Sequence, residues 1–523
     1  MSGRHLLASL LAAAALAQTP AAGPPSVSLT GVVKEATTRV PLEGVRVWAG
    51  QSDATTGPQG QFTFQKLEPG RHWVSVEDLD RAASGGVFVL LNPGRDVTGV
   101  EILLNSGGSI SGKVLDEDRK PISGARVSLL EPVFEFGQLA YRSKLSEKTG
   151  ANGEYRLAPV PSGRGFLLLA ARPIELGPRD QRSASPVFYP ASPDILGGET
   201  VTLAPGEERR AVDFRMAFAP AFCIAGQVDS SGGAAAGEVT ITRQLPHLFG
   251  SWTLSLTIPA ADGKFSGCGF PPGDYRVGAS GFASAEAAIV DADLDDLRLV
   301  PASAIALSGD AVFDPPPRGD TPEARIGADL RKVRDKHVEE TQSGSIRTSF
   351  SYGGRIRVPG SFSLQRLPAD DYAVDLRDLP EGCYVKEATL AGADILHAPL
   401  RLSEALDSRL RIALACDAGS LQARVTDREG NPVSDVNVFV IPGDAGSAAA
   451  LSMVVRQAAV ENGWSGTVKP LPPGKYLVLA AHLDFDGSAE PFLKLWRWRS
   501  HAKEVEIGTN QSTRVMIELA DLN

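Results

Sequence analysis

One short pattern recurs along the chain at intervals of about 100 residues, and it limits what the chain can fold into. The first copy consists of Gly31 to Val33, Pro41 to Val47, Gly60 to Phe64, and Pro69 to Val76. Val45 and Val47 alternate with polar residues, which is typical of a half-buried strand. Pro69 and Gly70 suit a type II turn, because proline fixes φ and glycine accepts a positive φ. The pattern predicts short strands joined by tight turns.

The later copies begin at Gly112, Gly226 and Val425, and the fourth is clear only at Gly360 to Leu364. Asp370 and Asp371 replace the Pro-Gly turn in the fourth copy. The turns fall at 70, 163, 273, 370 and 474, a spacing that suits one β-sandwich domain per copy. The sequence predicts an all-β chain of tandem Ig-like β-sandwich modules. The expected segments are 1–17 (signal peptide), 27–105, 106–220, 221–304, 305–417 (divergent) and 418–523.

The repeated motif is G-x-V…D-x-x-G-x-P-(V/I/L)-x-G-(A/V)-x-V, followed by G-x-(F/Y)-x-(F/L) and L-x-P-G-x-Y. It resembles the carboxypeptidase regulatory-like domain, well in copies one, two and five, partly in copy three and weakly in copy four. The resemblance implies a seven-stranded prealbumin-like or starch-binding-like sandwich. Such modules are found as non-catalytic appendages of metallocarboxypeptidases, as extensions of outer-membrane transporters and as tandem arrays in exported bacterial proteins. This chain is similar to the arrays.

The N-terminus has the features of a signal peptide. Arg4 and His5 precede an apolar run from Leu6 to Leu16, and Ala15 to Ala17 gives the small-x-small pattern before a cleavage site. The run is too short for an anchor across a bilayer of about 30 Å. We therefore expect cleavage after Ala17 and a periplasmic, outer-membrane-associated or extracellular protein. The later sequence contains no apolar stretch long enough for a membrane-spanning helix.

Charge and cysteine usage narrow the function classes. With 52 basic and 62 acidic residues the net charge is −10, which argues against a nucleic-acid partner. Four cysteines allow three pairings, and an exported protein can keep disulfides. The positions favour Cys223 with Cys268 and Cys383 with Cys416, one pair in each of two neighbouring modules. Their spacing does not suit zinc.

The search for catalytic groups gives no site. His337 and Glu340 have the H-x-x-E spacing of a metal-ligand pair, but no α/β peptidase domain surrounds them, so we interpret them as a chance match. No G-x-S-x-G elbow or Ser/His/Asp set is apparent. The acidic runs at 291–296 and 484–487 are interpreted as solvated turns, with calcium sites as the alternative. We expect no enzyme activity, catalytic residue, cofactor or metal.

Trp496 and Trp498 are the densest aromatic pair. On a strand they would point to one face, where indoles can stack on a sugar; the alternative, favoured by their alternation, is that both are core. The resulting hypothesis is a non-catalytic binding or scaffolding protein for a saccharide or protein partner at the cell envelope. The alternative is an accessory or unrecognised hydrolase subunit associated with a peptidase or an outer-membrane transporter.

Overall fold

The computed structural model describes residues 26–520, apart from gaps at 37, 51, 79–82, 105–106, 230–236, 250–253, 303–304, 317–322, 334–350, 403–407 and 435. The predicted signal peptide, His337 and Glu340 lie outside the described residues. The chain divides into two compact units, which are treated separately. The smaller unit comprises the residues up to Asp78 together with Ser84–Leu104, and the larger one contains nearly all of the remaining chain.

The smaller unit is a seven-stranded sandwich of two sheets. One sheet has the order β4-β1-β7 and the other the order β3-β2-β5-β6. Its strands are β1 (Val27–Glu35), β2 (Arg46–Ala49), β3 (Ser52–Thr55), β4 (Gln61–Leu67), β5 (Gly70–Asp78), β6 (Ala83–Leu91) and β7 (Val97–Leu104). Buried Val33 and Phe62 come from the first sheet, and buried Val47 and Val76 from the second. The alternation at Val45 and Val47 therefore does mark a side that faces the core.

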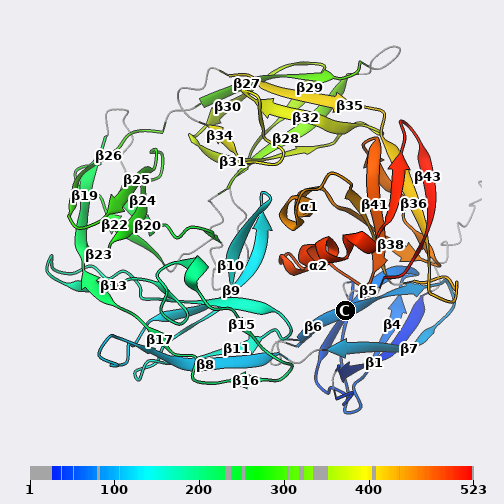
Figure 1. Cartoon of the computed structure of the whole chain (residues 1–523), viewed down its shortest axis with the longest axis horizontal. Helices are drawn as coiled ribbons and strands as arrows, with labels where there is room; N and C mark the ends of the chain where they lie inside the picture. The colour runs from blue at the N-terminus through cyan, green and yellow to red at the C-terminus, as the bar shows by residue number, and fades with distance from the viewer. Residues whose placement is uncertain are drawn as a thin grey trace, which may run out of the picture. The chain divides into compact units, whose positions relative to one another are not determined.

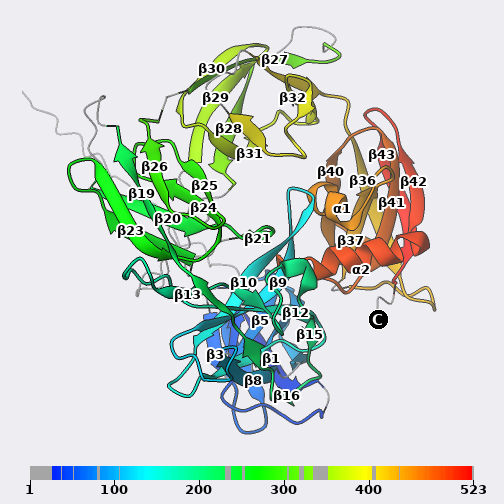
Figure 2. The ribbon, with the colours of Figure 1, turned by 60° about the vertical axis from the view of Figure 1, so that its left-hand side comes forward.

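The larger unit contains four more sandwiches in chain order (Figure 1, Figure 2). The second consists of β8 (Gly108–Leu115), β9 (Arg126–Glu135), β10 (Gln138–Lys148), β11 (Glu154–Val160), β12 (Gly165–Ala171), β13 (Arg182–Ala184), β14 (Val187–Phe188), η1 (Ile195–Gly197), β15 (Val201–Thr202), β16 (Glu208–Arg209), β17 (Phe214–Arg215) and β18 (Phe218–Pro220). The third consists of β19 (Phe222–Val228), β20 (Glu238–Arg243), β22 (Ser255–Pro259), β23 (Lys264–Phe270), β24 (Gly273–Gly278), β25 (Ala285–Ile289) and β26 (Leu294–Leu299). Between β20 and β22 in the chain, β21 (Leu248–Phe249) pairs with β10 and extends a sheet of the second sandwich.

The fourth and fifth sandwiches complete the larger unit. The fourth consists of β27 (Ile305–Phe313), β28 (Ala324–Lys332), β29 (Ser351–Val358), β30 (Gly360–Leu367), β31 (Asp370–Arg377), β32 (Tyr384–Leu390), β33 (Ala393–Asp394), β34 (Leu400–Leu402) and β35 (Leu410–Ala415). The fifth consists of β36 (Gly419–Thr426), β37 (Asn437–Pro442), α1 (Ala448–Val454), β38 (Arg456–Glu461), β39 (Trp464–Ser465), β40 (Val468–Leu471), β41 (Gly474–Ala481), α2 (Glu490–Trp498), η3 (Arg499–His501), β42 (Lys503–Ile507) and β43 (Ser512–Glu518).

All five sandwiches share the pairing around their first strand, although β32 and β33 extend this sheet in the fourth and β39 connects the two sheets in the fifth. The first strand of each pairs antiparallel with the strand that follows the G-x-(F/Y) turn and parallel with a late strand. The central strands are β1, β8, β19, β27 and β36. Because parallel neighbours need a long crossover, each copy must pass through its other sheet before it returns. The predicted all-β fold of tandem Ig-like sandwiches is therefore confirmed, whereas the exact module boundaries stay a prediction.

Each sandwich of the larger unit has its own hydrophobic core, drawn from both of its sheets. In the second, Ile110 of β8 and Leu129 of β9 belong to one buried cluster, and the third, fourth and fifth have separate clusters. Each core therefore removes apolar surface from water within its own copy of the repeat. No helix in the described part of the chain is long and apolar enough to span a membrane.

The first glycine of the motif is explained by a close contact with the aromatic residue of the next piece. Gly226 on β19 pairs directly with Phe265 on β23. A Cβ at Gly226 would lie 2.2 Å from the Leu297 carbonyl oxygen and 2.7 Å from Phe265 Cζ. The same pairing joins Gly31 to Phe62, Gly112 to Tyr155, and Gly309 to Phe362. The two motif pieces thus form two sides of one contact.

The fifth sandwich replaces this glycine–aromatic contact with a pair of small residues. Ala423 stands at the glycine position, and its amide donates a 2.9 Å hydrogen bond to Oγ of buried Ser465. A side chain is therefore tolerated on the first strand where the opposing ring is absent.

Two disulfides connect paired strands within single sandwiches. Cys223 on β19 and Cys268 on β23 are directly opposite one another and are bonded, and Cys383 is bonded to Cys416 in the fourth sandwich. The predicted pairing is confirmed. Each bridge closes a loop within one copy, so it stabilises that copy against local unfolding.

Candidate functional site

Trp496 and Trp498 lie on a helix, so their predicted placement on a strand is wrong. Both belong to α2, where residues two apart point in different directions. Both are half-buried and pack around a cluster that includes Phe439, Leu479 and Leu495. Figures 1 and 2 show α1 and α2 beside the strands of the fifth sandwich.

Two sequence features indicate the helix, a proline at its start and a buried residue one turn later. Both precede residues 496–499, which by themselves alternate like a strand. Pro491 stands in the first turn, a position that proline favours, and Leu495 supplies a fully buried contact one turn later. The Arg499 guanidinium lies 3.6 Å from the centre of the Trp496 ring and covers one of its faces. The geometry that motivated sugar stacking is therefore absent, and ligand contact at these two residues stays a proposal without support from their position.

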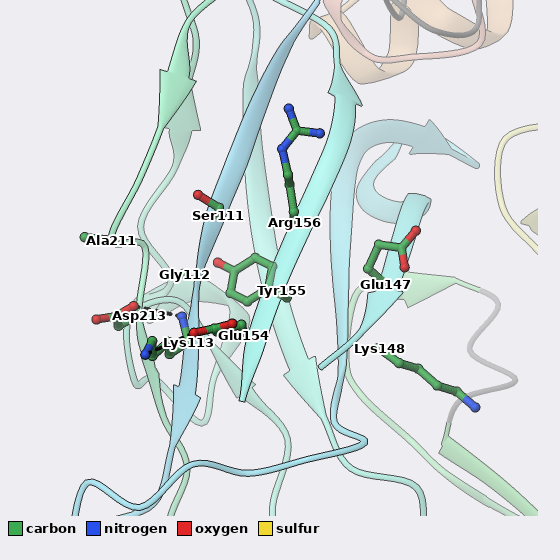
Figure 3. A pocket seen from close by; sticks show the side chains of 10 residues that line it. All are labelled: Ser111, Gly112, Lys113, Glu147, Lys148, Glu154, Tyr155, Arg156, Ala211 and Asp213. Carbon is green, nitrogen blue, oxygen red and sulfur yellow. Dashed lines mark hydrogen bonds and ion pairs between the residues drawn. The ribbon is translucent and has the colours of Figure 1, made fainter. Parts of the chain in front are cut away.

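A hollow of about 690 Å³ lies on the outer face of the second sandwich, over β8 and β11 (Figure 3). Residues of the repeat motif form its floor: Gly112 is paired with Tyr155, and Tyr155 donates a 2.7 Å hydrogen bond to the Val212 carbonyl. Burial raises the pKa of the Tyr155 hydroxyl, so this group stays neutral. The Tyr155 hydroxyl therefore holds the segment around Val212 against β8, the first strand of this sandwich.

Three of the charged groups around this hollow, Lys113, Glu154 and Asp213, are held by one another or by the backbone. Lys113 Nζ lies 3.3 Å from a Glu154 carboxylate oxygen, and the Lys113 amide donates a 2.8 Å hydrogen bond to Asp213. Figure 3 shows these three residues close together, whereas the Lys148 side chain points away from them. Neutralised pairs on an open face do not present a nucleophile beside a base, which is the arrangement that nucleophilic catalysis requires. The hollow therefore resembles a solvated sheet surface.

The first acidic segment considered for calcium is occupied by protein groups. Asp293 accepts a 2.8 Å hydrogen bond from the Cys223 amide and pairs with Arg179 at 2.9 Å. Arg179 also lies 3.7 Å from Asp295. Arg179 therefore occupies the position between these two carboxylates where a cation would have to bind.

The second acidic segment forms part of a contact inside the larger unit. Asp486 accepts a hydrogen bond from Ser488 Oγ at 2.6 Å and pairs with Arg164 of the second sandwich at 2.8 Å. Burial alone would raise the pKa of Asp486, but the bonds from Ser488 and Arg164 hold it below its usual value. Across the described residues, no group of three or more His, Cys, Asp or Glu side chains is placed to hold a metal ion.

An exposed tryptophan on the fifth sandwich was missed by the sequence reasoning. Trp464 begins β39, pairs with Arg424 of the central strand β36 and is 37% exposed. It directly follows Gly463, at a position of the repeat that the other copies fill with a polar residue. Aligning the residue after this glycine in all five copies would have identified it.

No family model and no curated protein matches the chain. Among solved structures, similarity is found to a streptococcal ancillary pilin, 11% identical over 53% of this chain and 99% of that one, with a TM-score of 0.21. The TIE protein of Bacillus anthracis is 12% identical over 76% and 68%, with a TM-score of 0.18. The minor pilin GBS52 of Streptococcus agalactiae is 16% identical over 37% and 97%, with a TM-score of 0.23. At these TM-scores the similarities carry no argument about function.

Proposed function

We propose that this chain is an exported, non-catalytic array of β-sandwiches that acts as a binding or scaffolding protein at the cell envelope. The export part is supported by the two disulfides, because such bonds form and persist in oxidising compartments outside the cytosol. A leader segment at residues 1–17 would supply the export signal.

We further propose that the five sandwiches are divergent copies of a carboxypeptidase regulatory-like module. Their shared pairing around the first strand and the recurrent pairing of a glycine with an aromatic residue support a common origin within the chain. In this proposal each copy presents a binding surface and catalyses no reaction.

The observation that carries the non-catalytic part is the state of the hollow on the second sandwich. Lys113, Glu154 and Asp213 are tied to one another or to the backbone, the Lys148 side chain points away from them, and the Tyr155 hydroxyl is held by a carbonyl (Figure 3). An enzyme site would instead direct titratable groups toward a shared reacting atom. The partner is proposed to be a saccharide or a protein of the envelope.

Sedimentation with isolated envelopes of the producing cell tests the binding part. The full chain, with its disulfides intact, should be retained saturably on envelopes and remain in solution without them. Incubation with peptide and glycan substrates should release no product above buffer. Absence of retention would contradict the envelope role, and turnover that a single substitution abolishes would favour the alternative of an unrecognised hydrolase.

A further inference from the structure

The outer face of the fifth sandwich differs from that of the other copies at one repeat position. The residue after the turn glycine is Gln61, Glu154, Lys264 and Ser361 in copies one to four, and each of these is exposed. In copy five this residue is Trp464, which is also exposed. A single exposed indole is ordinary on a protein surface, as at Trp73, so the significance of Trp464 depends on the side chains that surround it.

The local sequence fixes the orientation of Trp464. Asn462 and Gly463 both have positive φ, 50° and 77°, and join β38 to β39 as a two-residue hairpin turn. Asn-Gly suits this turn because both central residues must adopt a left-handed conformation. The next residue, Ser465, is buried against β36, so the alternation of the strand points Trp464 outward.

Two arginines of neighbouring strands flank the indole. The Arg424 guanidinium carbon lies over the ring at 5.9 Å from its centre and that of Arg514 on β43 at 5.8 Å, both farther away than the 3.6 Å contact by which Arg499 covers Trp496. Neither arginine forms an ion pair with a described residue, whereas many exposed arginines of this acidic chain do. Met516, directly opposite Arg424 on β43, is 56% exposed. We call Trp464, Arg424, Arg514 and Met516 the Trp464 face.

We propose that the Trp464 face binds an anionic saccharide built of carboxylated sugars. The apolar face of a sugar ring can pack on the exposed indole, while the ring's carboxylate pairs with a guanidinium, which binds planar carboxylates through two hydrogen bonds. Both guanidiniums lie beside the same indole, so one stacked unit of the saccharide and its neighbour can engage them together.

The arrangement favours this ligand over the two related ones. A neutral saccharide would use the indole but leave both arginines without a counter-charge. An acidic peptide would supply carboxylates but not the apolar face of a sugar ring that packs on the indole. Glu461 on β38 is the cross-strand neighbour of Trp464 on the side away from β36. Because its carboxylate repels a polyanion, the ligand is directed toward β36 and β43. This inference deepens the proposed binding function and rests on it.

Isothermal titration calorimetry of the full chain with tetragalacturonate tests the proposal, with maltotetraose and poly-glutamate as comparison ligands. We expect binding of tetragalacturonate that weakens as salt is raised, because the charged contacts are exposed to solvent. Maltotetraose and poly-glutamate should each bind at least about tenfold more weakly, which corresponds to about 1.4 kcal/mol.

The variants Trp464→Ala and Arg424→Gln/Arg514→Gln should each weaken tetragalacturonate binding by at least about tenfold. Trp464→Phe should retain part of the affinity, because it keeps a ring. Arg456→Gln is the matched control, because Arg456 lies in the same sandwich, at the end of β38 that pairs with β37. The affinity of this variant for tetragalacturonate should lie within about twofold of that of the parent chain. An unchanged melting temperature establishes that each variant is folded.

Failure to bind tetragalacturonate, or binding unaffected by these substitutions, overturns the proposal. Poly-glutamate binding that depends on the arginines but not on Trp464 also overturns it, in favour of an acidic peptide. If Trp464→Ala abolishes saccharide binding but envelopes still retain the variant, the face is correct and another surface supports the envelope role. If the parent chain binds tetragalacturonate but is not retained on envelopes, the proposed function fails while this site stands.

Discussion

A methyl group added at Gly226 should loosen the third sandwich without changing any polar contact. The new Cβ would lie 2.2 Å from the backbone oxygen of Leu297, which cannot rotate away, and 2.7 Å from Cζ of Phe265. Phe265 is 2% exposed, so its ring has no solvent to move into. Overpacking of this kind usually costs 1–3 kcal/mol, and contact with backbone on one side and a buried ring on the other gives about 3 kcal/mol for Gly226→Ala.

Hydrogen exchange followed by mass spectrometry measures this cost inside the full chain, because it reports the opening of individual segments. Amides of β19 and β23 should exchange about 100-fold faster in Gly226→Ala, the factor that corresponds to about 3 kcal/mol. Peptides from the fourth and fifth sandwiches should be unaffected, since their cores are separate.

Gly237→Ala supplies the matched control in the same sandwich. No atom lies within 4 Å of a Cβ built at Gly237, so this variant should exchange within about twofold of the parent. Equal exchange in the two variants would refute the claim that the motif glycine is required by the close approach of the late strand and the aromatic ring.

Two further predictions concern the same sandwich. Replacing Cys223 and Cys268 with Ala should lower the free energy of unfolding of the third sandwich by about 4 kcal/mol, because the bridge closes a loop with a sequence separation of 45. Urea unfolding followed by hydrogen exchange measures this loss. A loss below about 1 kcal/mol would contradict the expected loop constraint. Burial raises the pKa of Tyr275 from 10.0 to about 12, so folding favours the neutral phenol, and the resulting stability should be complete below pH 10 and lost as pH rises toward 12. Tyr275→Phe, which also removes the hydrogen bond to the Pro271 carbonyl, should lose about 1 kcal/mol at pH 8 and show a smaller further decline in urea midpoint between pH 9 and 11. A decline as steep as that of the parent would exclude Tyr275 as its source.

The repeat made most of the fold predictable from the sequence. Alternation at Val45 and Val47 and the Pro-Gly turns indicated strands and their connections, and these signals are local. The disulfide of the third sandwich follows the same register, because Cys223 and Cys268 each lie three residues from the Gly226–Phe265 pair, in opposite directions along their strands. The motif did not explain why its first residue must be glycine. The reason is the close approach of Leu297, which lies on a parallel neighbouring strand about 70 residues later in the chain than Gly226.

The candidate binding residues were predicted less well. Trp496 to Arg499 alternate like a strand over four residues, but Pro491 and Leu495 reveal a helix when the window is extended toward the N-terminus. Tertiary packing on Phe439 and Leu479 then buries half of each indole. Trp464 escaped notice because its significance comes from two arginines on strands that are distant in sequence.

The state of the four cysteines in protein taken directly from its own cells is the most direct test of an exported, disulfide-stabilised array. Differential alkylation and mass spectrometry would identify each bond, together with the N-terminal residue and the fraction that holds the protein. The account predicts Cys223–Cys268 and Cys383–Cys416 bonds, an N-terminus at Gln18 and a location outside the cytoplasm. Four free thiols on a cytoplasmic chain that keeps residues 1–17 would contradict it.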